Sequence, residues 1–178
     1  MRSTRLHAVL LSLLLALPAA PAGAQVVISQ VYGGGGNSGA TYTHDYVELF
    51  NRGQAPVALL GKSVQYASST GTFSNTTALP DATLQPGQYF LLQLASGATG
   101  VALPVSADAT GGLNLSGTTG KVALVNATTS LACGSSAAPC SEVSTLLILD
   151  RIGYGTNTFP ETAAAPGLSN STMAIRAA

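Results

Sequence analysis

Apolar, β-branched segments alternate along the chain with stretches rich in Gly, Pro, Asn and Asp. In the segment 45–51, Val47 and Leu49 share one face of an extended chain, while Glu48 lies on the other. No hydrophobic repeat near 3.6 residues is found, so no helix longer than one or two turns is predicted. The pattern instead predicts strands at 26–32, 45–51, 62–68, 84–95, 120–127 and 145–155, a last strand within 169–178, and at most one irregular edge strand between 69 and 83.

The segment 84–95 combines a turn signal with a continuous apolar run. Pro86 and Gly87 suit a turn, and the residues from Tyr89 to Leu92 are all apolar or aromatic. We expect this run to form a central strand that is buried on both faces. With about seven to nine strands and no long helix, the chain is predicted to be all-β, and the spacing of its strands and turns is typical of a sandwich or small barrel.

The first 24 residues have the layout of a secretory signal peptide. A basic start, "MRSTRLH", precedes the apolar run "AVLLSLLLAL", and small residues, "AGA", end the segment. The apolar run is too short to span a bilayer, which takes about 20 residues. We therefore expect cleavage after Ala24, export to the periplasm or the medium, and a mature chain from Gln25 to Ala178 that forms one domain without a membrane span.

The charges of the mature chain are few and scattered. Five cationic side chains stand against seven carboxylates, for a net charge of minus two. Nucleic-acid binding through phosphate contacts needs a clustered basic surface, which this composition does not supply. Nucleic acid is therefore not a predicted partner.

Cys133 and Cys140 lie in "LACGSSAAPCSE", a segment rich in Gly, Ser and Pro. In an exported protein, two cysteines this close are expected to form a disulfide bond, which for so short a loop contributes roughly 2 to 3 kcal/mol in the chain-entropy model. A redox or metal pair is disfavoured, because the spacing is not C-x-x-C and no histidine lies nearby.

The segment "VYGGGGNSG", residues 31–39, contains Gly34-x-Gly36-x-x-Gly39, the spacing of a dinucleotide-binding fingerprint. That fingerprint requires a helix to begin at the third glycine, but a strand pattern follows within about five residues. We therefore interpret the segment as a loop between strands whose glycines can adopt positive φ, and we expect alanine at 34–36 to alter binding more than folding. The candidate binding loop comprises Gly33, Gly34, Gly35, Gly36, Asn37, Ser38, His44 and Asp45.

The inventory of nucleophiles and bases does not favour catalysis. His44 is the only histidine of the mature chain; Asp45 follows it and Ser38 is near in sequence, but no G-x-S-x-G motif exists. The seven carboxylates are scattered rather than clustered as a metal-dependent nuclease or phosphatase would require. The chain is therefore predicted not to be an enzyme.

No cofactor is predicted, and calcium is the weakly supported alternative. Asn37, Asp45, Asp108 and Asp150 could offer oxygen ligands beside glycine-rich loops. No D-x-D-x-D spacing is present, and Asx residues at turns are the favoured explanation of these positions.

Several strings together resemble the bacterial branch of the lamin tail domain family. They are "VVISQVYGGGGNSGATYTHDYVELFNRGQAPVALLGKSVQYAS", "LQPGQYFLLQ", "LDRIGYG" and "LSNSTMAIR", in this order. The resemblance implies an immunoglobulin-like β-sandwich and a non-catalytic module of secreted or surface proteins, in which it often accompanies an extracellular nuclease, phosphatase or other hydrolase. It carries over no catalytic residues.

Two hypotheses follow from the residues and the resemblance. In the first, the protein is a secreted, non-catalytic module that binds or positions an unidentified protein or surface polymer at the cell exterior. In the alternative, it is the accessory or targeting domain of an extracellular nuclease or related hydrolase, truncated from its catalytic partner or acting beside it.

Overall fold

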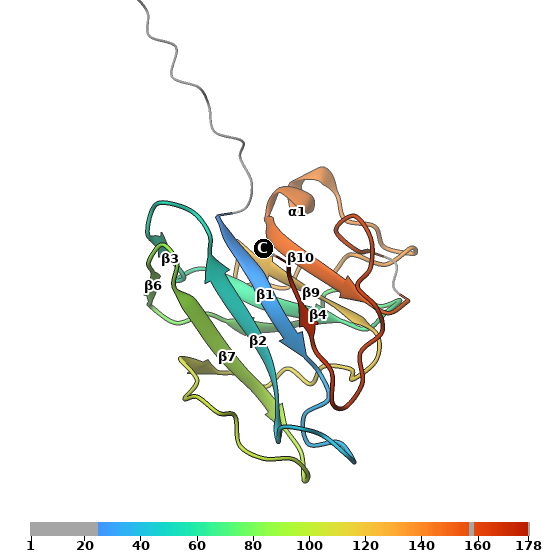
Figure 1. The fold of residues 1–178 in the computed structure, drawn as a ribbon. Helices are drawn as coiled ribbons and strands as arrows, with labels where there is room; N and C mark the ends of the chain where they lie inside the picture. Colours follow the sequence, from blue (N-terminus) through green and yellow to red (C-terminus); the bar gives the residue numbers. More distant parts are fainter. Residues whose placement is uncertain (1–24, 157–158, 178) are drawn as a thin grey trace, which may run out of the picture.

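The larger of the two main sheets contains the N-terminal strand, the strand that follows the glycine loop and the last strand of the chain. A computed structural model describes residues 25–156 and 159–177. The strand order in this five-stranded sheet is β11-β1-β2-β7-β8, and all neighbours are antiparallel except β7 and β8 (Figure 1). The strands are β1 (Val26–Tyr32), β2 (His44–Asn51), β7 (Tyr89–Ser96), β8 (Ala109–Thr110) and β11 (Ala174–Ile175).

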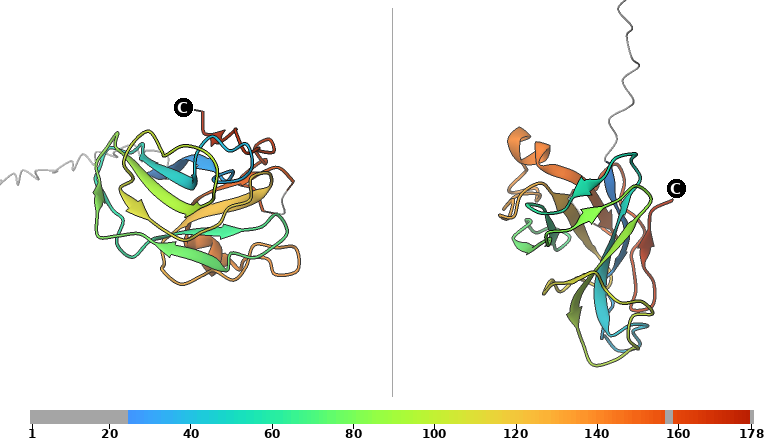
Figure 2. Two further views of the ribbon diagram at one scale, coloured as in Figure 1. Left: turned by 90° about the horizontal axis from the view of Figure 1, so that it is seen from below. Right: turned by 90° about the vertical axis from the view of Figure 1, so that its left-hand side faces the viewer.

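The second sheet has four antiparallel strands in the order β10-β9-β4-β5, and a two-stranded ribbon, β3-β6, lies beside the sandwich. Seen from below, the two main sheets lie one over the other (Figure 2). The strands are β4 (Ser63–Ala67), β5 (Asn75–Ala78), β9 (Gly120–Val125) and β10 (Ile148–Tyr154), with β3 (Val57–Ala58) and β6 (Thr83–Leu84) in the ribbon.

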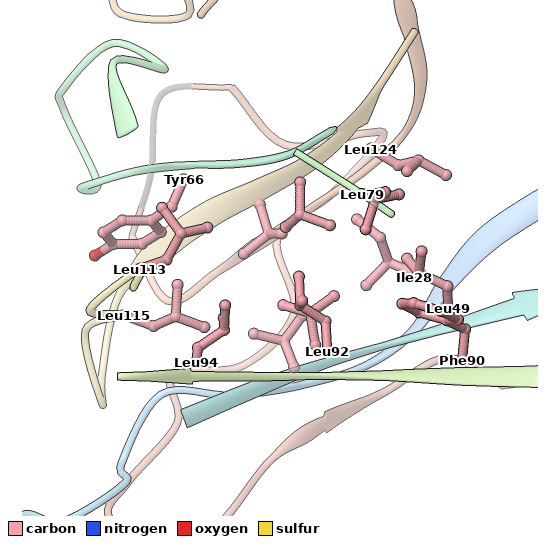
Figure 3. Packing of buried hydrophobic residues seen from close by; sticks show 14 of the residues in the cluster. Ile28, Leu49, Tyr66, Leu79, Phe90, Leu92, Leu94, Leu113, Leu115 and Leu124 are labelled. Carbon is pink, nitrogen blue, oxygen red and sulfur yellow. The ribbon is translucent and has the colours of Figure 1, made fainter. Parts of the chain in front are cut away.

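The core fills the space between the two main sheets (Figure 3). Strand alternation explains its composition, because every second side chain of each strand points to the same face. The larger sheet contributes Ile28, Leu49, Phe90, Leu92 and Leu94, the second sheet contributes Val64, Tyr66, Val122 and Leu124, and connecting segments add Leu79, Leu113 and Leu115.

The outer faces of the two sheets differ. Every residue of β4 and β9 is buried, so both faces of these strands are covered. On the outer face, Phe73, Ala123 and Val125 form a second apolar cluster, against which Leu131 and Ile148 pack. In β7 the burial alternates instead, and the outward residue Tyr89 is 55% exposed. The outer face of the five-stranded sheet is therefore only partly covered.

The predicted fold class is confirmed, and so are most of the predicted strands. The prediction that the run at 89–92 is buried on both faces is wrong, because Tyr89 and Leu91 point to the partly covered face. The segment 145–155 is a strand only from Ile148, since its first residues belong to helix α1 (Glu142–Leu146). Ser141 caps this helix by accepting a hydrogen bond from the N–H of Ser144 at 3.1 Å.

The predicted signal peptide, residues 1–24, lies outside the described residues. In the described part of the chain, no helix has the length and apolar character needed to cross a bilayer.

Candidate binding surface

The predicted binding loop packs closely against the backbone of neighbouring segments. A Cβ at Gly35 would overlap the backbone of His44, and one at Gly36, which has φ +70°, would overlap Gly97. The N–H of Gly36 donates to the carbonyl of Tyr42 at 2.9 Å, which closes the loop on itself. We therefore expect alanine at these two glycines to lower stability before it alters binding, contrary to the expectation from sequence.

Asp45 holds this loop to the sandwich. Its carboxylate is buried and accepts hydrogen bonds from the N–H of Gly35 and the N–H of Leu115, both at 2.8 Å. Burial raises the pKa of Asp45 to about 6, although both of these hydrogen bonds favour the charged form. Asp45 thus joins the glycine loop and the start of β2 to the distant segment at Leu115, which is a structural role.

The other polar residues of the loop contact different neighbours. Nδ1 of His44 lies 2.9 Å from Oγ1 of Thr43. The side chain of Asn170 meets Asn37 and also donates to the carbonyl oxygen of Ser38 at 2.9 Å. These contacts do not link Ser38, His44 and Asp45 into a nucleophile, base and orienting acid.

The four residues considered for calcium are bound to different parts of the chain. Asp150 forms an ion pair with Arg176, and Asp108 accepts a hydrogen bond from the N–H of Leu91 at 2.7 Å. Within residues 25–156 and 159–177, no group of three or more His, Cys, Asp or Glu side chains is placed to hold a metal ion.

The predicted disulfide bond is confirmed. Cys133 and Cys140 are joined, with an S–S distance of 2.01 Å.

Lys121 holds the loop that contains this disulfide bond to the second sheet, a role that the sequence did not indicate. Its side chain is fully buried in β9. Its Nζ donates to the carbonyl of Gly134 at 2.7 Å and to that of Ser69 at 3.2 Å. Burial lowers the pKa of Lys121.

A cavity of about 200 Å³ lies on the outer face of the five-stranded sheet, beside the predicted loop. Its floor comes from three adjacent strands, because the register places Gln30 opposite Glu48 and Glu48 opposite Leu91. The segment 103–105 lies over one side. The lining residues are Gln30, Tyr42, Tyr46, Glu48, Leu91, Leu103, Pro104, Val105 and Met173.

Three tyrosines cluster at one side of this cavity. The rings of Tyr42 and Tyr46 line it with their centroids 6.3 Å apart, and the ring of Tyr32 packs against both. The hydroxyl of Tyr46 lies 3.1 Å from Oε1 of Gln30 and 3.0 Å from Sδ of Met173. Burial raises the pKa of Tyr46 to about 12, and nearby Tyr42 and Glu48 act in the same direction.

A second hollow, of about 280 Å³, lies on the same sheet face near the end of β2. Phe50 and Tyr89 stack there with ring centroids 4.5 Å apart. Arg52 and Arg176 also line this hollow, whereas the only charged side chain that lines the first cavity is Glu48. The exposed face thus combines aromatic rings with a carboxylate in one hollow and guanidinium groups in the other.

The alternation in 45–51 is evident from the sequence, but it does not identify this surface. That alternation places Tyr46, Glu48 and Phe50 on the face opposite Val47 and Leu49. It contains no information on which strands lie beside β2 or on what covers their outer face.

The fold is an immunoglobulin-like β-sandwich with one covered and one partly open outer sheet face. The family model described as Lamin Tail Domain matches residues 19–141, more than half of the chain. The chain therefore belongs to the lamin tail domain family. No curated protein matches it. The matched segment ends before β10 and β11, which complete the two sheets by pairing with β9 and β1.

Proposed function

We propose that this protein is an exported, non-catalytic module that binds a partner at the cell exterior through the outer face of its five-stranded sheet. The proposal rests on the difference in burial between the outer faces of the two sheets. The central strands of the second sheet, β4 and β9, are buried on both faces, whereas the outer face of β7, a central strand of the five-stranded sheet, leaves Tyr89 and part of Leu91 accessible. Accessible aromatic and aliphatic groups that lie together on one face are typical of binding surfaces.

Two further features support export and binding. The disulfide bond fits an oxidising compartment outside the cytoplasm. The sheet face presents both a carboxylate and guanidinium groups among apolar residues, which suits a partner with its own mixed charges. Such a partner is a protein or a surface polymer, and a secreted hydrolase, which the family resemblance implies, is one protein of this kind.

Binding to isolated cell envelopes of the producing organism tests this proposal. Tyr89→Ser combined with Ile175→Ser removes two exposed apolar groups from the proposed face. Val143→Ser combined with Leu146→Ser removes two from α1, where exposure is at least as high, and serves as the matched control. The first pair should reduce the bound fraction at least severalfold and the control should not. Equal binding by both variants, or no binding by the unaltered protein, would contradict the proposal.

A further inference from the structure

We propose that the cavity between Tyr42, Tyr46, Glu48 and the segment 103–105 binds a lysine side chain of the partner protein. This inference rests on the proposed function and identifies the group that the sheet face recognises. It follows from the charge, the size and the hydrogen-bonding capacity of the cavity.

The charge of the cavity favours a cation. Glu48 is the only charged residue among those that line it. Asp108 adds a second carboxylate nearby, since its side chain and its backbone both hydrogen-bond to the backbone of Leu91. Arg52 and Arg176 line the other hollow instead. A cationic group entering the cavity therefore meets the carboxylate of Glu48 and two electron-rich tyrosine rings, with the Asp108 carboxylate outside the lining.

The size and walls of the cavity fit a single side chain with an apolar stem. Its volume of about 200 Å³ is below the roughly 300 to 1,000 Å³ of pockets that enclose whole small ligands. Leu91, Leu103, Val105 and Met173 supply apolar surface on which four methylene groups can pack.

The hydrogen-bonding pattern favours lysine over arginine. Oε1 of Glu48 accepts a hydrogen bond from Oγ of Ser29 at 2.6 Å, which leaves Oε2 as the oxygen without a hydrogen bond to any described residue. A guanidinium prefers both oxygens of a carboxylate, whereas an ammonium is satisfied by one. Oε1 of Gln30 offers a further acceptor, because a carbonyl-type oxygen has two lone pairs.

The same pattern favours lysine over a quaternary ammonium such as choline. A quaternary ammonium cannot donate to Glu48 and depends on aromatic rings around it, and only two rings line this cavity. The proposed ligand is therefore a primary ammonium group on a flexible apolar stem.

An NMR titration of the purified protein with Nα-acetyl-lysine methylamide tests the assignment. We expect saturable shifts of the backbone amides of Tyr42, Tyr46, Glu48 and Leu91. Nα-acetyl-norleucine methylamide, which has the apolar stem without the charge, and choline should each bind at least tenfold more weakly. No shifts in the cavity with the lysine probe, or equal binding of either control compound, would overturn the assignment.

Variants localise the site. Glu48→Gln keeps an oxygen for Ser29 but removes the charge, and we expect about tenfold weaker binding of the lysine probe. Glu142→Gln, on α1, is the matched control and should bind as the unaltered protein does. Tyr42→Leu provides a second test if Glu48→Gln does not fold, and it should weaken binding at least threefold. Unchanged affinity in a folded cavity variant would refute the proposed site.

The result of the lysine titration can be distinguished from the result of the envelope-binding experiment. If envelopes bind the protein in a way that depends on Tyr89 and Ile175 but the lysine probe gives no shifts, only the cavity assignment fails. If envelope binding is absent as well, the binding surface itself is wrong.

Discussion

At the scale of single residues, buried carboxylates join segments that are distant in sequence. Strand β1 shifts register between Ile28 and Gln30, and Oδ2 of Asp150 accepts a hydrogen bond from the N–H of Ile28 at 2.6 Å. Arg176 contacts both carboxylate oxygens of Asp150 at 2.9 Å and donates to the carbonyl of Ile28 at 3.1 Å. Two side chains thus satisfy backbone groups that would otherwise be buried without partners.

Replacing Asp150 with alanine should therefore lower the free energy of unfolding by about 3 kcal/mol, because the N–H of Ile28 loses its partner and Arg176 keeps only the more exposed Glu161 as an ion-pair partner. Urea unfolding followed by circular dichroism measures the change. Asp81→Ala, at an exposed carboxylate, is the control and should change the free energy by no more than about 0.5 kcal/mol. Similar losses in the two variants would show that the buried ion pair has no special role.

Asp45 makes the stability of the protein depend on pH. Its pKa in the folded state, about 6, lies above the ordinary value of 3.8, so the folded state binds more protons than the unfolded state between these values. The free energy of unfolding should therefore fall as the pH rises from about 4 to about 6. Burial also raises the pKa of Asp150, which acts in the same direction.

A ¹³C NMR titration of the Asp45 carboxyl group measures this directly, and we expect a midpoint near pH 6. Urea unfolding at several pH values gives the matching change in stability, and its slope should be smaller in Asp45→Asn. A midpoint near 4 would mean that the hydrogen bonds from Gly35 and Leu115 fully offset the effect of burial on the pKa of Asp45.

At the scale of elements, backbone conformation and close packing explain why the glycine loop is rich in glycine. Gly36 and Gly39 both have positive φ, at +70° and +77°. A Cβ at Gly36 would overlap the backbone of Gly97, whereas a Cβ at Gly39 would meet no atom within 4 Å. The two positions therefore separate the effect of backbone conformation from that of close approach.

Gly39→Ala should lower the free energy of unfolding by about 1 kcal/mol, the cost of a positive φ alone. Gly36→Ala should cost clearly more, because the backbone at Gly97 must also move. Thermal melts of both variants measure the difference. Equal melting temperatures would show that the backbone at Gly97 can move away from the added Cβ with no loss of stability.

The elements that sequence reasoning missed are short and depend on distant partners. Strands β3, β6 and β8 have two residues each, too few for an alternation pattern to be detected. Residues 145–146 continue an apolar run and were predicted as strand, but the serine cap at Ser141 begins a helical turn there. The long strands β1, β2 and β9 were predictable because their patterns extend over six or more residues.

At the scale of the whole molecule, the outer faces of the sandwich differ in how far their central strands are covered. The segment that contains the disulfide bond covers the second sheet, and Lys121 holds it in place. On the other side, the segment 103–105 covers only part of the five-stranded sheet. This asymmetry is the basis for placing the proposed binding surface on the five-stranded sheet.

If residues 1–24 act as a signal peptide, the protein recovered outside the cytoplasm should begin at Gln25, which intact-mass measurement and N-terminal sequencing detect. Blocking the apolar run, for example with Leu13→Arg and Leu14→Arg, should leave the protein unprocessed inside the cell. A chain that keeps Met1 in the exported fraction would contradict the prediction.

The all-β class, most of the long strands, the cysteine pair and the position of the glycine loop could be predicted from the sequence. These follow from local rules, since a two-residue alternation and turn residues act over a few positions. The burial of Asp45 and Asp150 at contacts between separate segments became evident from the three-dimensional arrangement. The same holds for the cavity that Tyr42, Glu48, Leu103 and Met173 line. The physical reason is that strand neighbours, and the segments that cover a sheet face, are set by contacts between residues far apart in the chain, which no local pattern specifies.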